Sequence, residues 1–192
     1  MKKSTVVVVS FLFVALIFFA GNFAFVKSYS TSNVTTGIAK AGNIPTFKDG
    51  FCVYPDSYFG KLVAEELRNK GHKVKLLEKP KECDGQFLAV WVEEINITYT
   101  PIKSSGVVRA VPIYSSIGRP KHCLEYKNAE NKTLALRSFV SDVRGEVQAY
   151  TIITLKDSSK GIMSFRGYQD YLLELTAREI VKVISEGDVH ES

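Results

Sequence analysis

Three cysteines, Cys52, Cys83 and Cys123, are the side chains in this sequence that are best suited to covalent or metal chemistry. Cys123 directly follows His122, so a thiol and an imidazole are neighbours along the chain. Thiolates and imidazoles are preferred zinc ligands, and a thiol activated by an imidazole is a common catalytic nucleophile. The residues therefore suggest two alternative chemistries for Cys83, His122 and Cys123: a metal site or a thiol-dependent enzyme.

The spacing of these residues argues against both chemistries. No C-x-x-C or H-x-x-x-H pair occurs, and two adjacent ligands fit poorly around one tetrahedral ion. Catalytic partners are normally brought together by the fold rather than by adjacency in the sequence. The signatures of a P-loop, a nucleophile elbow and a zinc protease are also missing. We therefore predict no metal, no cofactor and a non-catalytic protein, and keep the metal-binding or thiol-dependent enzyme as the alternative.

Glu93 is a further candidate for chemistry because of the strand in which it lies. Strict alternation would place it on the same face as Phe87, Ala89 and Trp91, which are apolar. A carboxyl group on an apolar face would have a raised pKa and could act as a general acid. A β-bulge, or the strand leaving the core at this point, would instead turn the side chain towards solvent, and we favour that interpretation.

The pattern of apolar residues predicts the elements that must position these side chains. Residues 51–55, FCVYP, form a short apolar run that ends at proline, as expected of a strand. From Asp56, a potential N-cap, to Gly71, a potential stop, apolar residues recur at the spacing of a helix face. Alternation over residues 72–79 predicts a second strand, and a strand–helix–strand unit of this length makes the two strands parallel.

The N-terminus carries a long apolar run from Thr5 to Val26, with no charge in it and with lysines on both sides. Its length suffices for a helix across a bilayer core of about 30 Å. We therefore predict a signal-anchor over residues 1–27 that contacts the lipid bilayer through residues 5–26, with its N-terminus in the cytoplasm. The alternative is a cleaved signal peptide and a secreted domain. The small residues that signal-peptide cleavage requires are, however, missing from the −3 positions of the candidate sites.

The remainder of the chain predicts an α+β fold. The expected arrangement is an N-terminal transmembrane helix, then one mixed β-sheet with two helices packed on one face. The sheet combines the βαβ unit with an antiparallel meander. The expected later strands are 86–100, 107–117, 133–143, 146–156 and 162–166, and the final helix is 168–185.

The expected strand directions bring three loops to one end of the sheet. The strand at 86–100 is expected to run antiparallel to the two before it, so that loops 80–86, 118–132 and 157–161 meet. All three loops carry basic residues, and long loops on a rigid scaffold often carry binding sites. The loops form either a solvated rim or a surface for a partner or ligand, and the candidate binding residues are Arg119, Lys121, His122 and Lys127.

The same topology predicts which cysteines pair. Cys83 and Cys123 fall in the loops that meet, whereas Cys52 begins the first strand at the opposite end. A disulfide needs Cα atoms within about 7 Å, so we predict a Cys83–Cys123 disulfide and a buried free thiol at Cys52. The alternative Cys52–Cys83 pairing would require the second strand to end elsewhere.

Composition divides the chain into segments and suggests its compartment. Residues 28–46 are small and polar and predict a flexible stalk, residues 47–186 predict an extracytoplasmic α/β domain, and residues 187–192 form a tail. Three N-x-[ST] sequons make Asn33, Asn96 and Asn131 candidate glycosylation sites.

The net charge of +5 does not indicate nucleic-acid binding. Three of the 25 basic residues flank the apolar run, and the remaining 22 face 20 acidic residues without clustering. The sequence as a whole predicts a single-pass, membrane-anchored extracytoplasmic interaction or assembly module. Its partner would be another membrane or envelope protein. A cleaved, secreted binding domain is the remaining alternative.

Overall fold

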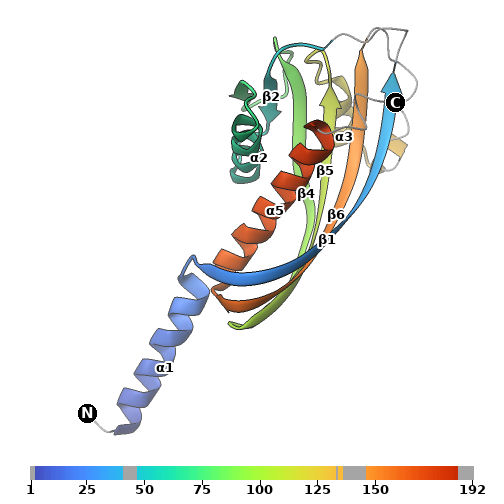
Figure 1. Ribbon diagram of the computed structural model, residues 1–192. Helices are drawn as coiled ribbons and strands as arrows, with labels where there is room; N and C mark the ends of the chain where they lie inside the picture. Colours follow the sequence, from blue (N-terminus) through green and yellow to red (C-terminus); the bar gives the residue numbers. More distant parts are fainter. Residues whose placement is uncertain (1–2, 41–46, 133, 136–145, 186–192) are drawn as a thin grey trace.

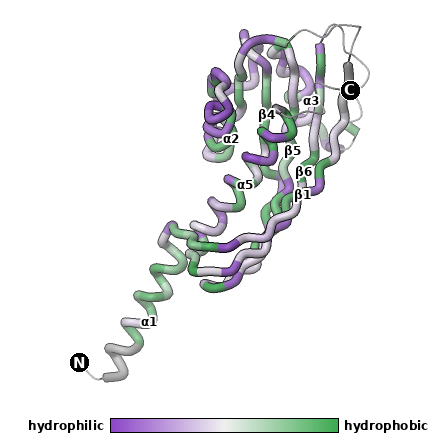
Figure 2. Tube along the Cα trace, viewed as in Figure 1, coloured by the Kyte–Doolittle hydropathy of each residue, from purple (hydrophilic) through white to green (hydrophobic). Residues whose placement is uncertain are grey.

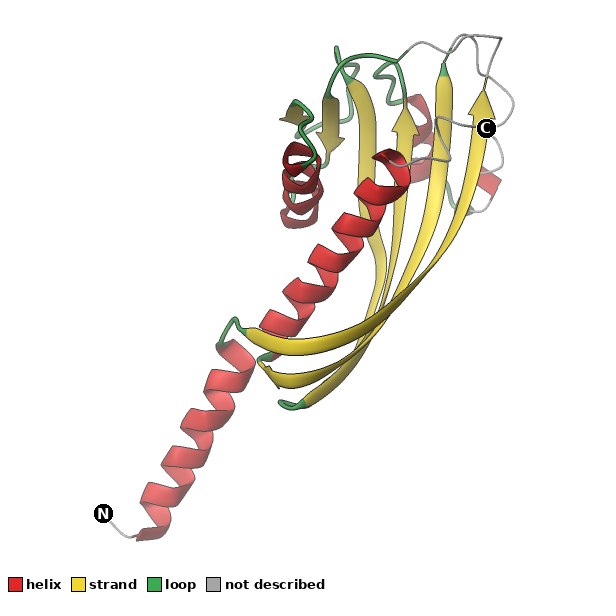
Figure 3. Cartoon of the chain, in the orientation of Figure 1, coloured by secondary structure: helices red, strands yellow, loops and turns green. Residues whose placement is uncertain are grey.

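The computed structural model describes residues 3–40, 47–132, 134–135 and 146–185 (Figure 1). A long, curved sheet carries helices on both faces, and an N-terminal helix projects from one end of it (Figure 3). In chain order the elements are α1 (Lys3–Ala20), β1 (Ala24–Lys40), β2 (Phe51–Tyr54), α2 (Tyr58–Asn69), β3 (Val74–Leu76), β4 (Gln86–Thr98), β5 (Lys103–Ser115), α3 (Lys121–Asn128), β6 (Val147–Met163) and α5 (Phe165–Ser185).

The six strands form one mixed sheet in the order β1-β6-β5-β4-β2-β3. β2 pairs in parallel with β3 and with β4, and every other pairing is antiparallel. The mixed α+β sheet and the parallel βαβ unit β2-α2-β3 therefore agree with the prediction. The direction of β4 does not, because residues 77–85 carry the chain back to the end of the sheet where β2 begins.

The predicted membrane-spanning helix is wrong, because the apolar run is divided between two elements. α1 ends at Ala20, and the residues from Ala24 onwards belong to β1. From Thr5 to Ala20 the helix is about 24 Å long, shorter than a bilayer core of about 30 Å. In the part of the chain that the structure describes, no helix is long and apolar enough to cross a membrane. α1 is predominantly hydrophobic (Figure 2), and most of its described large apolar side chains are exposed, but the signal-anchor and the single-pass location are not supported.

The predicted stalk is also wrong, since residues 28–40 belong to β1. This strand pairs with β6 in an unbroken antiparallel register from Ala24–Met163 to Lys40–Val147. The segment contains Thr and Val, whose β-branched side chains suit a half-exposed strand. Residues 41–46 and the predicted tail at 187–192 lie outside the described residues.

β6 replaces two predicted strands and the turn between them. Residues 157–161 were expected to turn the chain, but they continue β6 and pair with β1 on one side and β5 on the other. Because β6 lies between β1 and β5, the backbone groups of these polar residues can pair with a strand on either side. Of the predicted strand 133–143, residues 134 and 135 are helical and the others lie outside the described residues.

Hydrogen bonds to the side chain of Asp157 link β1 and α5 to β6. Its buried carboxylate accepts hydrogen bonds from Ser28 on β1, from Ser159 at 2.7 Å and from Tyr168 on α5 at 2.8 Å. Burial, and then the neighbouring Asp157 carboxylate, raise the pKa of Tyr168 above its usual value, so its hydroxyl remains a donor. Within the described residues, the three hydroxyl groups satisfy the carboxylate without a cationic partner.

α2 forms as expected, but its N-cap is Ser57 instead of Asp56. The Ser57 hydroxyl accepts from the Gly60 N–H at 3.1 Å, while Asp56 forms an ion pair with Lys61 at 3.2 Å. Gly71 follows the helix with φ +91°, the conformation that makes glycine the preferred stop.

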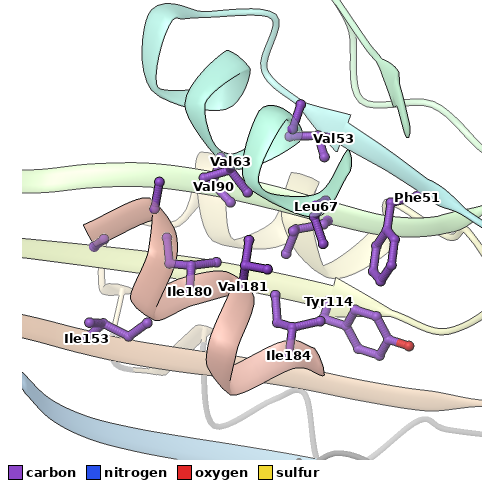
Figure 4. Packing of buried hydrophobic residues seen from close by; sticks show 14 of the residues in the cluster. Phe51, Val53, Val63, Leu67, Val90, Tyr114, Ile153, Ile180, Val181 and Ile184 are labelled. Atoms are coloured by element: carbon purple, nitrogen blue, oxygen red, sulfur yellow. The ribbon is translucent and has the colours of Figure 1, made fainter. Parts of the chain in front are cut away.

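α2 and α5 cover one face of the sheet, and their apolar residues make the main core (Figure 4). The prediction of two helices on one face is incomplete, since α3 covers part of the opposite face. There the Tyr126 ring packs on Trp91 with centroids 5.7 Å apart. The side chains that interlock in the main core include Val63, Leu67, Val53, Val90, Ile153, Ile180, Val181 and Ile184.

A Gly161→Ala substitution tests the pairing of β1 with β6. Gly161 has φ +146°, and a Cβ there would lie 2.1 Å from the Phe25 carbonyl oxygen on β1. We expect the free energy of unfolding, measured by urea denaturation, to fall by about 1–3 kcal/mol. Gly71→Ala is the matched control, because Gly71 also has a positive φ but has no atom within 4 Å of the added Cβ. Equal losses in both variants would contradict a closely packed β1.

Candidate functional site

A disulfide joins Cys52 on β2 to Cys83 in the loop after β3, with the Cα atoms 6.7 Å apart. The predicted Cys83–Cys123 pairing is therefore wrong. The reason is the parallel pairing of Phe51 with Gln86, which returns the start of β4, and Cys83 just before it, to the start of β2. Cys123 is the free thiol and is buried on α3.

The disulfide-bearing loop packs tightly against the loop that follows β5. The Cys83 N–H donates to the Gly118 carbonyl at 3.2 Å, and Lys48 Nζ donates to the Cys83 carbonyl at 2.8 Å. Gly118 has φ +83°, and a Cβ there would lie 2.3 Å from the Cys83 carbonyl oxygen. Glycine is thus required for this close approach. The expectation that the loops near 80–86 and 118–132 meet is confirmed, although 157–161 lies elsewhere within β6.

A pocket of about 500 Å³ opens where these two loops meet. Leu77 and Ile117 contribute apolar surface to it, and the remaining side chains are mostly charged. Four basic residues outnumber two acidic ones in its lining. The charged lining residues are Lys48, Lys75, Lys81, Arg119, Glu82 and Asp84.

Two of the four basic side chains interact with other groups of the protein, and the other two form no ion pair within the described residues. Arg119 Nη1 lies 3.4 Å from the carboxylate of Glu146, which is only 1% exposed, whereas the Arg119 side chain is 51% exposed. Lys48 is engaged with the Cys83 carbonyl. Lys75 and Lys81 form no ion pair with the residues that the structure describes. The pocket therefore presents net positive charge, which suits an anionic group.

The buried Glu146 carboxylate fixes the position of Arg119. Besides its ion pair with Arg119, it accepts from Ser115 Oγ at 3.1 Å and from Gln148 Nε2 at 2.6 Å. The Arg119 backbone N–H also donates to Ser115 Oγ at 3.2 Å. These contacts hold the guanidinium at the rim of the pocket before any ligand arrives.

The other predicted binding residues do not join Arg119 in one surface. His122 is buried, with Nδ1 2.6 Å from a Glu125 carboxylate oxygen, so its predicted place on a loop surface is wrong. Lys127 donates to the Tyr54 hydroxyl at 3.2 Å and lies 5.9 Å from the centre of that ring. Lys121 begins α3 and is exposed, but it does not line the pocket.

The residues proposed for thiol or metal chemistry are not brought together as a reactive site. Cys83 is oxidised, and burial raises the pKa of the Cys123 thiol to about 12, with Lys127 opposing the rise. A thiol with this pKa is a poor nucleophile because it stays protonated near neutral pH. Among the described residues, no group of three or more His, Cys, Asp or Glu side chains could hold a metal ion.

Glu93 lies at a β-bulge in β4, which confirms the interpretation favoured from the sequence. The register of β4 against β5 shifts between Val92 and Glu94. The Glu93 carboxylate then accepts a hydrogen bond from the Tyr126 hydroxyl and lies 3.3 Å from Arg109 Nε. Glu93 thus links β4 to β5 and α3.

The three sequon asparagines, Asn33, Asn96 and Asn131, are all exposed, and their glycosylation remains a prediction. The two basic lining residues that the sequence did not indicate for the pocket are Lys48 and Lys75. Alternation in HKVKLLEK places Lys75 on one face of β3, but only the position of the neighbouring loop shows that this face lines a pocket.

Comparisons with known proteins do not assign the chain to a family. No family model and no curated protein matches it. Among solved structures, it is similar to the dodecamer of a PelC variant from Paraburkholderia phytofirmans, with a TM-score of 0.36 and 14% identity. That match covers 79% of this chain and 95% of the other.

Replacing the disulfide should destabilise the protein. In the chain-entropy model, a bridge with a sequence separation of 31 contributes about 3–4 kcal/mol. We expect the double variant Cys52→Ser, Cys83→Ser to lose an amount of this order in urea denaturation, whereas Cys123→Ala keeps the bridge. Peptide mapping of the unreduced protein checks the pairing. A Cys83–Cys123 linked peptide would contradict the account.

Cys123 should be unreactive until the protein unfolds. At pH 8 a rise in pKa from 9.0 to about 12 lowers the thiolate fraction from roughly a tenth to roughly one part in ten thousand. We expect no modification by a maleimide or a disulfide reagent in the native state and one modified thiol per chain in urea. Because the raised pKa favours the neutral thiol, reactivity should rise only well above pH 8. Rapid native modification at pH 8 would contradict burial of this thiol.

Proposed function

We propose that this protein is a non-catalytic interaction module that binds an anionic group in the pocket beside the Cys52–Cys83 disulfide. The observation that carries the proposal is the pair of lysines, Lys75 and Lys81, that face the pocket without an acidic partner among the described residues. Exposed lysines of this kind bind phosphate or carboxylate groups as point charges, while a guanidinium adds directional hydrogen bonds. The ligand is therefore a phosphate- or carboxylate-bearing molecule, or such a group on a partner protein.

The construction of the pocket supports a binding role in a second way. The disulfide, the Cys83–Gly118 hydrogen bond and the contacts of Glu146 hold both loops and Arg119 in place. A site that is already ordered loses less conformational freedom when a ligand binds, which favours affinity. The disulfide also fits an oxidising compartment, outside the cytoplasm.

The chemistry of the pocket supports binding over catalysis. The one cysteine in its lining is held in a disulfide, and its charged groups are lysines, one arginine and two carboxylates. None of these is a nucleophile paired with a base. Such a lining suits electrostatic recognition of an anion.

Phosphate titration tests this proposal. We expect inorganic phosphate to shift the backbone amide NMR signals of residues 77–85 and 116–120 in a saturable manner. The double variant Lys75→Glu, Lys81→Glu should weaken this binding by about tenfold or more, and a higher salt concentration should weaken it in the wild type.

Lys182→Glu is the matched control, because Lys182 is an exposed lysine on α5, outside the pocket lining. It should bind phosphate as the wild type does. Equal loss of binding in the control and in the double variant, or shifts spread over the whole surface, would contradict a defined site.

A further inference from the structure

Three lysines form a row across neighbouring strands, far from the pocket in the fold. Lys160 on β6 is directly opposite Lys27 on β1 and directly opposite Lys103 on β5. Directly paired residues of a sheet point to the same face, and all three side chains are exposed. Lys156 lies on the same face of β6, four residues before Lys160, and is also exposed.

This lysine row, Lys27–Lys160–Lys103, leaves its positive charge uncompensated. Like charges directly opposite each other in a sheet are destabilising. None of the three lysine side chains forms an ion pair or hydrogen bond with the residues that the structure describes. A negatively charged partner outside the described chain would remove this repulsion.

The row ends at β1, which is an edge strand (Figure 1). β1 is 17 residues long, and its register with β6 has no bulge. It contains no proline, and between Lys27 and Lys40 it has no charged residue. Protein sheets normally protect long edge strands with bulges, prolines or charged residues. Within the described part of the chain, the outer edge of β1 is therefore open to an added strand.

Large apolar side chains border the row on the same face. Phe25 is 78% exposed and lies directly opposite Ile162, which is 56% exposed. Tyr29, on the other side of Lys27 along β1, is 65% exposed. Exposed aromatic side chains are enriched at protein interfaces.

We propose that an acidic polypeptide segment binds here as an added strand along the outer edge of β1, with its carboxylates facing the lysine row. The row supplies charge complementarity, and the free backbone groups of the β1 edge supply hydrogen bonds that only a polypeptide can accept and donate in register. This edge favours an acidic peptide over an anionic lipid surface or a polysaccharide. The surface is separate from the pocket proposed above.

Synthetic peptides of about ten residues, alternating Glu with Val or Thr, are suitable probes because this length matches a typical strand. Binding to the full chain is measured by fluorescence anisotropy. We expect saturable binding that is lost when Lys replaces Glu in the peptide. The protein variant Lys27→Glu, Lys160→Glu, which reverses the charge of the two lysines nearest the added strand, should bind about tenfold or more weakly. The control variant Lys61→Glu, Lys182→Glu changes the charge of the protein equally at positions outside the row and should bind as the wild type does.

Backbone methylation of the peptide tests the added strand itself. Two peptides are methylated at the amide nitrogens of alternate residues, one at odd positions and one at even positions, which keeps the carboxylates but removes donors. At least one of the two should lose binding. Undiminished binding of both, equal weakening in the control variant, or binding of the protein to phosphatidylglycerol vesicles but not to the peptide would overturn the proposal.

Discussion

The arrangement of the sheet depends on one pairing, the parallel alignment of β2 with β4. Because Phe51 is opposite Gln86, residues 77–85 must return along the sheet before β4 begins. That return places Cys83 beside Cys52 and against Gly118 at the end of β5. The disulfide, the two packed loops and the basic pocket all follow from it. If β4 ran the other way, the same residues would be distributed over opposite ends of the sheet.

A second constraint holds the N-terminal strand in the fold. Asp157 accepts hydrogen bonds from β1 and from α5, so it links the edge strand to the helix that covers the sheet. The unbroken pairing of β1 with β6 then aligns Lys27 with Lys160. The pocket and the lysine row are thus separate surfaces, each positioned by a different part of the sheet.

Local features of this fold could be predicted from the sequence, and long-range pairing could not. The apolar face of α2 and the stop at Gly71 follow from residues within one helix, and the bulge at Glu93 follows from a carboxylate that breaks an apolar pattern. Residues 28–40 resemble a stalk because an edge strand with one exposed face does not need a continuous apolar pattern. The direction of β4 depends on a return loop whose sequence, rich in lysine and glutamate, carries no directional signal.

The candidate site likewise combines one residue that the local sequence indicates with others that only long-range pairing brings together. Arg119 was among the predicted binding residues because it lies in a basic loop, and it does line the pocket. Lys75 and Lys48 are far from Arg119 in the sequence, and they reach the pocket only because of the order of the strands in the sheet. The sequence places His122 on a loop surface, whereas α3 turns its imidazole inwards. A helix of only eight residues has a weak signal in the sequence.

Anomalous diffraction from crystals of the protein soaked in a bromide or selenate salt would show whether the pocket beside the Cys52–Cys83 disulfide is a preformed anion site. We expect an anomalous peak between Lys75, Lys81 and Arg119, with both loops in the positions described. A pocket that is filled by its own side chains, or anomalous peaks elsewhere but none there, would contradict it.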